Sequence, residues 1–356
     1  MSSGRVLIIG GGPAGIEAAR GLADLGVPVT IVESRDRLGG MPIAAHYATL
    51  TPSLEDAEQA MARMLAPLLG NPAVELRLGA AVSGFAGAAG DFELSVARNG
   101  SQESVRAGAI IVATGFQHFD PGRETQMYGY YEFDDVITLP ESEKMLKEHS
   151  FVRPSDGRLP ERVAFIQCVG SRDRQIGNEF CSKVCCGVAS KQAIEIRQQL
   201  PEAKVFIFYI DMRMYGYWEN RIYWPAQEQY KVNYIRGIVA EVLKKGDRLV
   251  IRGEDTTLGR PMEIAVDVVV LSVGMEPSQG TREMARLLGL RQNKYGYIET
   301  EGVPLATVLT SVEGVFAAGA CTGPADLEDS VSMGGAAALK AAALVRKKAL
   351  AAGATG

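Results

Sequence analysis

The fold is decided near the amino terminus by the stretch Arg5-Val6-Leu7-Ile8-Ile9-Gly10-Gly11-Gly12-Pro13-Ala14-Gly15. Its apolar half predicts a buried parallel strand, and its glycines spell G-x-G-x-x-G at the start of a helical pattern over 16–25. A second apolar strand over 29–32 ends at Glu33, 21 residues after Gly12. This order of strand, glycine loop, helix, strand and acid predicts a dinucleotide-binding module.

Each part of that motif has a physical task. Gly10 allows the tight turn, Gly12 lets the backbone approach a pyrophosphate, and Gly15 lets the helix pack closely on the strand. The helix N-terminus would face the phosphates, and Glu33 would accept hydrogen bonds from the ribose hydroxyls. Because an acid at this place suits an unphosphorylated ribose, the motif favours FAD or NAD over NADP.

Motifs farther along the chain select FAD. A Gly39-Gly40-Met41 run follows Glu33, the strand over 109–115 ends in Ala-Thr-Gly, and the segment 314–320 resembles a second flavin motif. That motif usually ends in Gly-Asp, whereas this chain has Ala320 at the second place. The predicted cofactor-binding residues are Gly10, Gly12, Pro13, Ala14, Gly15, Glu33, Ser34, Arg35, Gly40, Met41, Val82, Ala113, Thr114, Gly115, Gly319, Ala320, Ser330 and Val331.

An alanine-rich helix is expected to open at Asp329 and run to about residue 352. Its N-terminal dipole could stabilise negative charge at the pyrimidine end of a reduced flavin. The alternative is an ordinary amphipathic helix with no such role.

The module pattern occurs twice in the chain. A strand over 163–167 is followed by Cys168-Val169-Gly170, and a strand over 267–271 ends in Ser272-Val273-Gly274. The spacing from Gly10 to Gly115 is 115 − 10 = 105, and that from Cys168 to Gly274 is 274 − 168 = 106. We therefore expect an α/β fold with two Rossmann-like modules: residues 1–155 and 276–356 bind FAD, and residues 156–275 form an inserted module.

Four cysteines fall within 19 residues of the inserted module: Cys168, Cys181, Cys185 and Cys186. In proteins with two nucleotide modules this place holds NAD(P)H, but here no G-x-x-G continuation follows Cys168. The cysteine loop is therefore expected to replace that cofactor. Its spacing leaves an iron–sulfur cluster, a zinc site and thiol–disulfide chemistry open. Cys321 stands apart and is expected to be a small buried hydrophobic residue or to lie near the flavin.

Composition narrows the classes of protein. The chain has 356 residues with 47% hydrophobic and 22% charged residues, which excludes a disordered protein. The net charge of −5 leaves no basic footprint for nucleic acid. No apolar run reaches about 18 residues and no signal peptide is evident, so we expect no membrane span and a cytoplasmic protein with reduced or metal-bound cysteines. The three histidines argue against a histidine-rich metal centre.

At its cysteine motifs the chain resembles the A subunits of heterodisulfide reductases. The resemblance is carried by the runs 168–173, 180–186 and 189–193, with further matches at 128–130, 211–213, 226–228, 273–275 and 323–324 before Asp329-Ser330. It implies a thioredoxin-reductase-like core, one FAD, and a [4Fe–4S] cluster held by Cys168, Cys181, Cys185 and Cys186. It also implies an electron-transfer subunit whose substrate chemistry lies in partner B and C subunits, with no catalytic residue in this chain.

The chain also departs from the family pattern. It lacks the extra N-terminal domain and the ferredoxin-type cysteine runs of methanogen members, which speaks against electron bifurcation here. The short form is most similar to the A subunit of the heterodisulfide-reductase-like complex of sulfur-oxidising prokaryotes. The A subunit of the quinone-interacting oxidoreductase of sulfate reducers is the near alternative.

Two rival functions stay open. One is an autonomous NAD(P)H-dependent disulfide or ferredoxin reductase, and the other is a scaffold subunit with structural FAD and zinc. The predicted N-terminal part of the FAD module has no cysteine, and no histidine follows His149, which argues against direct disulfide reduction.

The segment 208–230 carries seven tyrosines and tryptophans with interleaved arginines. This density suits either a contact with a partner or a second copy, such as a homodimer, or an aromatic cover over the second sheet.

Overall fold

The computed structural model describes residues 4–123, 128–302 and 306–353. Its contacts divide the chain into two compact units. The first comprises Met1–Ala44, Gln59–Gln117 and Glu276–Gly356, and the second comprises Ala45–Glu58 and His118–Met275. The second unit is larger than the predicted 156–275, because residues 45–58 and 118–155 pack with it. β10 (Phe116–His118) and β19 (Met275–Pro277) carry the chain between the units.

The first unit is built on a five-stranded parallel sheet. Its strand order is β20-β9-β1-β2-β5, with bounds Val315–Ala317, Ala109–Val112, Val6–Ile9, Val29–Glu33 and Val74–Leu78. β1 and β9 are buried at every position, which explains why their sequences are continuous apolar runs. Because β1 is the central strand, the glycines that follow it lie at the carboxyl edge of the sheet.

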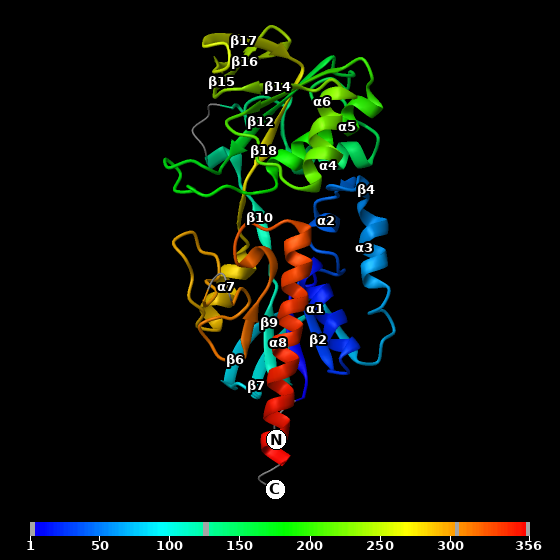
Figure 1. The fold of residues 1–356 in the computed structure, drawn as a ribbon, viewed down its shortest axis with the longest axis vertical. Helices are drawn as coiled ribbons and strands as arrows, with labels where there is room; N and C mark the ends of the chain where they lie inside the picture. The colour runs from blue at the N-terminus through cyan, green and yellow to red at the C-terminus, as the bar shows by residue number, and fades with distance from the viewer. Residues whose placement is uncertain (1–3, 124–127, 303–305, 354–356) are drawn as a thin grey trace. The chain divides into compact units, whose positions relative to one another are not determined.

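Helices and an antiparallel sheet complete the first unit. α1 (Pro13–Asp24) and α8 (Leu327–Gly353) lie side by side (Figure 1). A side chain at Gly334 would collide with the carbonyl oxygen of Ala14, so the two helices approach through small residues. The other elements are β6 (Ala80–Ala88), β7 (Asp91–Arg98), β8 (Ser101–Ala107), α2 (Met41–Ala44), α3 (Ala57–Leu65), α7 (Gln279–Leu287) and the 3-10 turn η3 (Gly319–Cys321).

The second unit repeats this plan. Its parallel sheet has the order β11-β18-β12-β13-β14, with bounds Val136–Thr138, Val268–Val273, Arg162–Val169, Lys204–Tyr209 and Asn233–Arg236. Alternate residues of β12 enter different apolar clusters: Phe165 packs with residues of α5, and Ile166 packs with residues of the antiparallel sheet. The other elements are α4 (Leu139–Lys147), α5 (Cys185–Gln199), α6 (Trp224–Glu228), β15 (Val239–Lys245), β16 (Arg248–Asp255), β17 (Arg260–Val266), β3 (Thr49–Leu50), β4 (Glu55–Asp56), η1 (Pro121–Arg123) and the π-turn η2 (Glu219–Tyr223).

In each unit, then, a five-stranded parallel sheet is joined to a three-stranded antiparallel one. This confirms the predicted α/β class with two Rossmann-like modules. One boundary differs from the prediction: α5 begins at Cys185. Cys185 and Cys186 therefore belong to the first helical turn and not to a loop before it.

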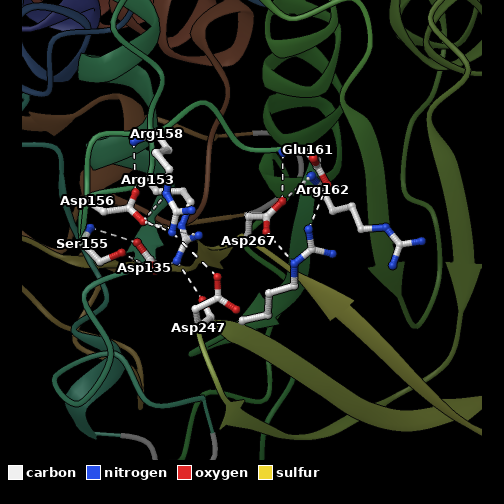
Figure 2. Close-up of polar contacts among 10 residues, drawn as sticks. Asp135, Arg153, Ser155, Asp156, Arg158, Glu161, Arg162, Asp247 and Asp267 are labelled. Carbon is white, nitrogen blue, oxygen red and sulfur yellow. Dashed lines mark hydrogen bonds and ion pairs between the residues drawn. The ribbon is translucent and has the colours of Figure 1, made fainter.

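A network of charged side chains joins the amino ends of the second sheet (Figure 2). The buried Asp135 carboxylate accepts hydrogen bonds from the Ser155 N–H at 3.0 Å and from Arg153 at 3.3 Å. The Asp267 carboxylate accepts from the backbone N–H groups of Glu161 at 2.8 Å and Arg162 at 2.9 Å. These contacts fix the loop that precedes β12 to the start of β18, at the edge opposite the cysteines.

Candidate functional site

The predicted glycine loop sits at the carboxyl end of β1. Gly10 has φ = +109°, and a side chain there would collide with the carbonyl oxygen of Ala113. A side chain at Gly15 would collide with the carbonyl oxygen of Gly10. Pro13 is the first residue of α1, where its missing N–H costs nothing, and Ala14 is buried behind it. The loop is therefore free of side chains where a pyrophosphate would meet the helix N-terminus.

Glu33 is buried at the end of β2 and holds this loop. Its Oε2 accepts a hydrogen bond from the Gly11 N–H at 2.7 Å, and its Oε1 accepts from the Arg35 N–H at 2.9 Å and the Ser34 hydroxyl at 3.1 Å. Ser34 and Arg35 are themselves exposed. A carboxylate has about four acceptor positions, so one remains for a ribose hydroxyl.

The Gly39-Gly40 pair packs directly on the glycine loop. The Gly39 N–H donates to the Gly11 carbonyl at 2.8 Å. A Cβ at Gly40, which has φ = +60°, would lie 2.7 Å from the Cα of Gly12. Met41 follows at the start of α2 and is half-buried.

The turn after β9 contains Ala113, Thr114 and Gly115, with φ = +67° at Gly115. The Thr114 hydroxyl lies 2.7 Å from the Thr281 hydroxyl, which donates to the Gly115 carbonyl at 2.9 Å. Ser278 caps α7 and donates to the Thr114 carbonyl at 2.9 Å. Sequence reasoning missed Ser278 and Thr281. The signal that could have found them is the serine N-cap three residues before the threonine.

Gly319 and Ala320 form the turn before α8. Gly319 has φ = +76°, and a Cβ there would lie 2.8 Å from the Ala14 Cβ and 3.4 Å from the Ser330 hydroxyl. Ala320 is buried, and no carboxylate replaces the expected Asp at that position. Ser330 donates its hydroxyl to the Asp326 carbonyl at 2.8 Å.

The start of α8 differs from the prediction. The helix begins at Leu327, two residues before Asp329. Asp326 caps it: its Oδ1 accepts from the Asp329 N–H at 2.7 Å, and the Asp329 Oδ2 accepts from the Asp326 N–H at 3.1 Å. Two carboxylates thus already oppose the helix dipole. Val331 is half-buried in the second turn.

Two further predicted positions belong to the core. Val82, on β6, is buried in an apolar cluster with Ile9 and Val32. Cys321 is fully buried, and its thiol lies 3.3 Å from the carbonyl oxygens of Val112 and Ala318. Burial raises the pKa of the Cys321 thiol to about 12, so it behaves as a small hydrophobic residue.

The clustered cysteines lie at the carboxyl edge of the second sheet. The Cys185 thiol donates to the carbonyl of Val273, at the end of β18, at 3.9 Å. The Cys186 thiol donates at 3.8 Å to the carbonyl of Asp211, which follows β13. Cys168 lies in β12, next to a break in the register of that strand with β18. The edge corresponds to the one that carries the glycine loop in the first unit.

The four thiols influence one another electrostatically. Burial raises the pKa values of Cys168 (to about 11), Cys185 and Cys186, and thiol–thiol repulsion contributes for every pairing among the four. The Arg172 guanidinium hydrogen-bonds the Cys168 thiol and lowers its pKa. In the part of the chain that the structure describes, no three Cys, His, Asp or Glu side chains form a group that could hold a metal ion.

The backbone around these cysteines is strained. Eight non-glycine residues in the described ranges have positive φ, and three of them lie here: Cys168 at +65°, Arg172 at +59° and Lys183 at +65°. Each such conformation costs of order 1–2 kcal/mol. Strain of this kind concentrates at functional sites.

A buried ionic cluster that the sequence did not reveal lies between α4 and α5. The Lys191 ammonium contacts the two carboxylate oxygens of Glu143 at 2.5 and 2.7 Å and Glu195 at 3.3 Å. Thr49 donates to Glu195 at 2.7 Å, and the Gln192 amide donates to Glu143 at 2.8 Å. The i, i+4 spacing of Lys191 and Glu195 was a visible signal, but Glu143 lies 48 residues away in sequence.

None of the helices in the described ranges is long and apolar enough to cross a membrane.

Known proteins give the geometry its context. The family model described as "Pyridine nucleotide-disulphide oxidoreductase" matches residues 4–153 and 212–343. The interval between those ranges contains the four clustered cysteines. The thioredoxin reductase of T. acidophilum matches the fold with a TM-score of 0.65 at 21% identity, over 95% of this chain and 97% of that one. This likeness confirms the thioredoxin-reductase-like architecture.

Sequence relatives confirm the resemblance to the A subunits of heterodisulfide reductases. One of two such iron–sulfur subunits of the CoB–CoM heterodisulfide reductase of Methanopyrus kandleri is 42% identical over 242 residues, which are 66% of this chain and 37% of the relative. The corresponding iron–sulfur subunit of Methanocaldococcus jannaschii is 32% identical over 92% of this chain and 62% of the relative. The chain thus spans less than two thirds of these relatives. By its match over most of its length, the chain belongs to the pyridine nucleotide-disulphide oxidoreductase family and is an FAD-dependent oxidoreductase.

Proposed function

We propose that this chain is the FAD- and iron–sulfur-containing electron-transfer subunit of a heterodisulfide-reductase-like complex. The observation that carries the proposal is the gathering of Cys168, Cys181, Cys185 and Cys186 at the carboxyl edge of the second sheet. In dinucleotide-binding folds this edge holds the cofactor. The relatives named as iron–sulfur subunits support the same assignment.

The residues of the first unit fit FAD. The glycine loop leaves the helix N-terminus open to a pyrophosphate, because side chains at Gly10 and Gly15 would collide with backbone. Glu33 is buried in the position to bind the ribose. When bound, FAD exchanges electrons in pairs, whereas an iron–sulfur cluster exchanges them singly, so two single transfers to or from a partner would balance each turnover.

The cysteine loop suits a cluster bound by several thiolates. The thiols lie near enough to repel one another electrostatically, although no group of the described residues is gathered tightly around a single ion. A four-iron cluster is larger than one metal ion, so the thiolates that hold it lie farther apart than those of a zinc site. The α5 N-terminus, where Cys185 and Cys186 lie, and the Arg172 guanidinium beside Cys168 would stabilise the negative charge of a thiolate-bound cluster.

The same loop argues against a pyridine-nucleotide site in the second unit. At the carboxyl end of β12 the chain has Cys168, and no glycine loop follows it. Electrons would therefore pass to and from protein partners instead of NAD(P)H. We propose B and C subunits of the complex as those partners, in cytoplasmic sulfur oxidation, with a homodimer of this chain as the assembly unit. The quinone-interacting oxidoreductase is the alternative complex.

An anaerobic reduction experiment tests this function. The FAD-loaded, cluster-containing protein is mixed separately with NADH, NADPH and dithionite, and flavin bleaching is followed by absorbance. We expect dithionite to bleach the flavin and neither nucleotide to do so, while a thioredoxin reductase serves as the nucleotide-responsive control. Rapid bleaching by NADPH or NADH would contradict the proposal and favour the autonomous reductase.

A further inference from the structure

The aromatic segment, residues 212–224, is fastened to the cysteine-bearing end of α5. The Trp218 ring is buried and covers Gly187, where any side chain would collide with it. The Arg213 N–H donates to the Cys186 sulfur at 3.5 Å. Met214, Trp218 and Ile222 all enter the apolar cluster beneath α5. Half of the segment thus serves as the cover that one sequence interpretation predicted.

The other half faces solvent. Tyr217 is 74% exposed, Tyr215 49% and Trp224 47%. The Arg221 guanidinium lies 5.9 Å from the centre of the Tyr217 ring, and the Lys183 ammonium lies 5.7 Å from that of Tyr215. Tyrosine, tryptophan and arginine are the residue types that dominate binding energy at protein interfaces. A cover alone would not require exposed aromatic rings in contact with cations.

The charge around these rings differs from that of the whole chain. Arg213 and Arg221 are exposed within the segment, and Lys183 lies beside it. Asp211 is engaged by Arg172 at 2.8 Å and by Arg236 at 3.5 Å, which leaves Glu219 as the exposed carboxylate of the segment. The chain as a whole carries −5, so this local cationic surface favours an acidic partner.

We propose that the aromatic segment, with Lys183, is the docking surface for an acidic electron-carrier protein that exchanges single electrons with this chain. The inference rests on the proposed function, because only a redox centre at the neighbouring cysteines would give a carrier reason to dock here. The rings would supply contact area, and the cations would speed the encounter and orient the carrier.

The test uses holoprotein reduced with dithionite and freed of excess reductant. An acidic [2Fe–2S] ferredoxin serves as the oxidised probe and takes one electron per molecule. Stopped-flow absorbance gives the second-order rate constant at several salt concentrations. The variants are Tyr217→Ala, Arg221→Glu and their combination. The controls are Leu159→Ala and Lys204→Glu, two exposed positions at the opposite, amino edge of the same sheet.

We expect the wild-type rate to fall as salt rises, and the double variant to be about tenfold slower at low salt with a flatter salt dependence. FAD and iron contents should stay unchanged, and the controls should match wild type. Rates equal to wild type in the double variant would overturn the docking surface. A wild type that transfers no electrons to the probe while holding iron would also overturn it, whereas a wild type without iron would refute the proposed function itself. Light scattering that shows a wild-type dimer and a monomeric double variant would assign the surface to a second copy.

Discussion

Gly10 and Cys168 occupy equivalent places in the two units, each at the carboxyl end of the central strand of a five-stranded parallel sheet. Both have positive φ, +109° for Gly10 and +65° for Cys168. Glycine adopts this conformation without penalty, whereas cysteine does not. The second unit therefore keeps the backbone of a nucleotide turn but places a thiol where glycine would be expected. The strain indicates that the thiol has a function that outweighs its cost.

This relationship predicts an order of stability among variants at position 168. In FAD-loaded, metal-free protein, Cys168→Gly should be more stable than Cys168→Ala by about 1–2 kcal/mol, since alanine keeps the left-handed strain and glycine removes it. Urea unfolding measures the difference. Equal stability of the two variants would show that the backbone at 168 is not held in the left-handed region.

Crowding at the glycine loop predicts a selective loss of FAD. Gly40→Ala would place a Cβ 2.7 Å from the Cα of Gly12, whereas Gly26→Ala meets nothing within 4 Å. Both positions have positive φ, so backbone strain is shared and only the crowding differs. We expect Gly40→Ala to weaken FAD binding about tenfold or more, equivalent to about 1.4 kcal/mol, and Gly26→Ala to leave it near wild type. Fluorescence titration of apoprotein with FAD measures both; equal affinities would contradict this placement of the cofactor.

The buried Lys191 cluster predicts a pH dependence of stability. Burial raises the pKa of Glu195, although the Lys191 ammonium opposes this. The folded state therefore holds the Glu195 proton more tightly than the unfolded state does. Its contribution to stability is fully present below the unfolded carboxyl pKa and is lost as pH rises through the folded pKa.

Glu195→Gln removes that contribution while keeping an acceptor for Thr49. Relative to wild type, the variant should gain thermal stability as pH rises from about 5 to 8. Glu254→Gln, at an exposed position on β16, is the control and should show no such trend. A difference between Glu195→Gln and wild type that stays constant with pH would show that Glu195 titrates alike in both states.

The charged network at the amino edge of the second sheet predicts unequal costs for two aspartates. Asp135→Asn leaves the buried Arg153 guanidinium without its buried counter-ion and should cost about 3–5 kcal/mol. Asp156, partly exposed in the same network, should cost about 1 kcal/mol or less when changed to Asn. Urea unfolding compares the two, and an equal cost would mean that the Asp135–Arg153 pair is effectively solvated.

The nucleotide loop and the repeat could be predicted from sequence because each depends on neighbouring residues. The Gly10–Gly15 spacing sets a backbone path, and a buried strand such as β1 declares itself as an apolar run. The start of α5 was missed because Cys185 and Cys186 have no capping residue before them, as Val184 occupies the N-cap. The Lys191–Glu143 pair was missed because only the folded chain brings α4 and α5 together.

The division into units was equally hard to anticipate. Residues 45–58 leave the first unit and return to it without a change in composition that marks the excursion. Their attachment depends on contacts such as Thr49 with Glu195, which lie 146 residues apart in sequence.

The central claim is that the clustered thiols hold an iron–sulfur cluster in an FAD protein. The most direct test is anaerobic purification with iron, sulfide, zinc and FAD assayed per chain, and electron paramagnetic resonance before and after dithionite. Cys185→Ala is the test variant, and Cys321→Ala, buried in the other unit, is the matched control. The account predicts about four irons and one FAD in wild type and in Cys321→Ala, as Cys₄ ligation of a four-iron cluster requires, with iron lost and FAD kept in Cys185→Ala. FAD without iron, or with one zinc per chain, would contradict it.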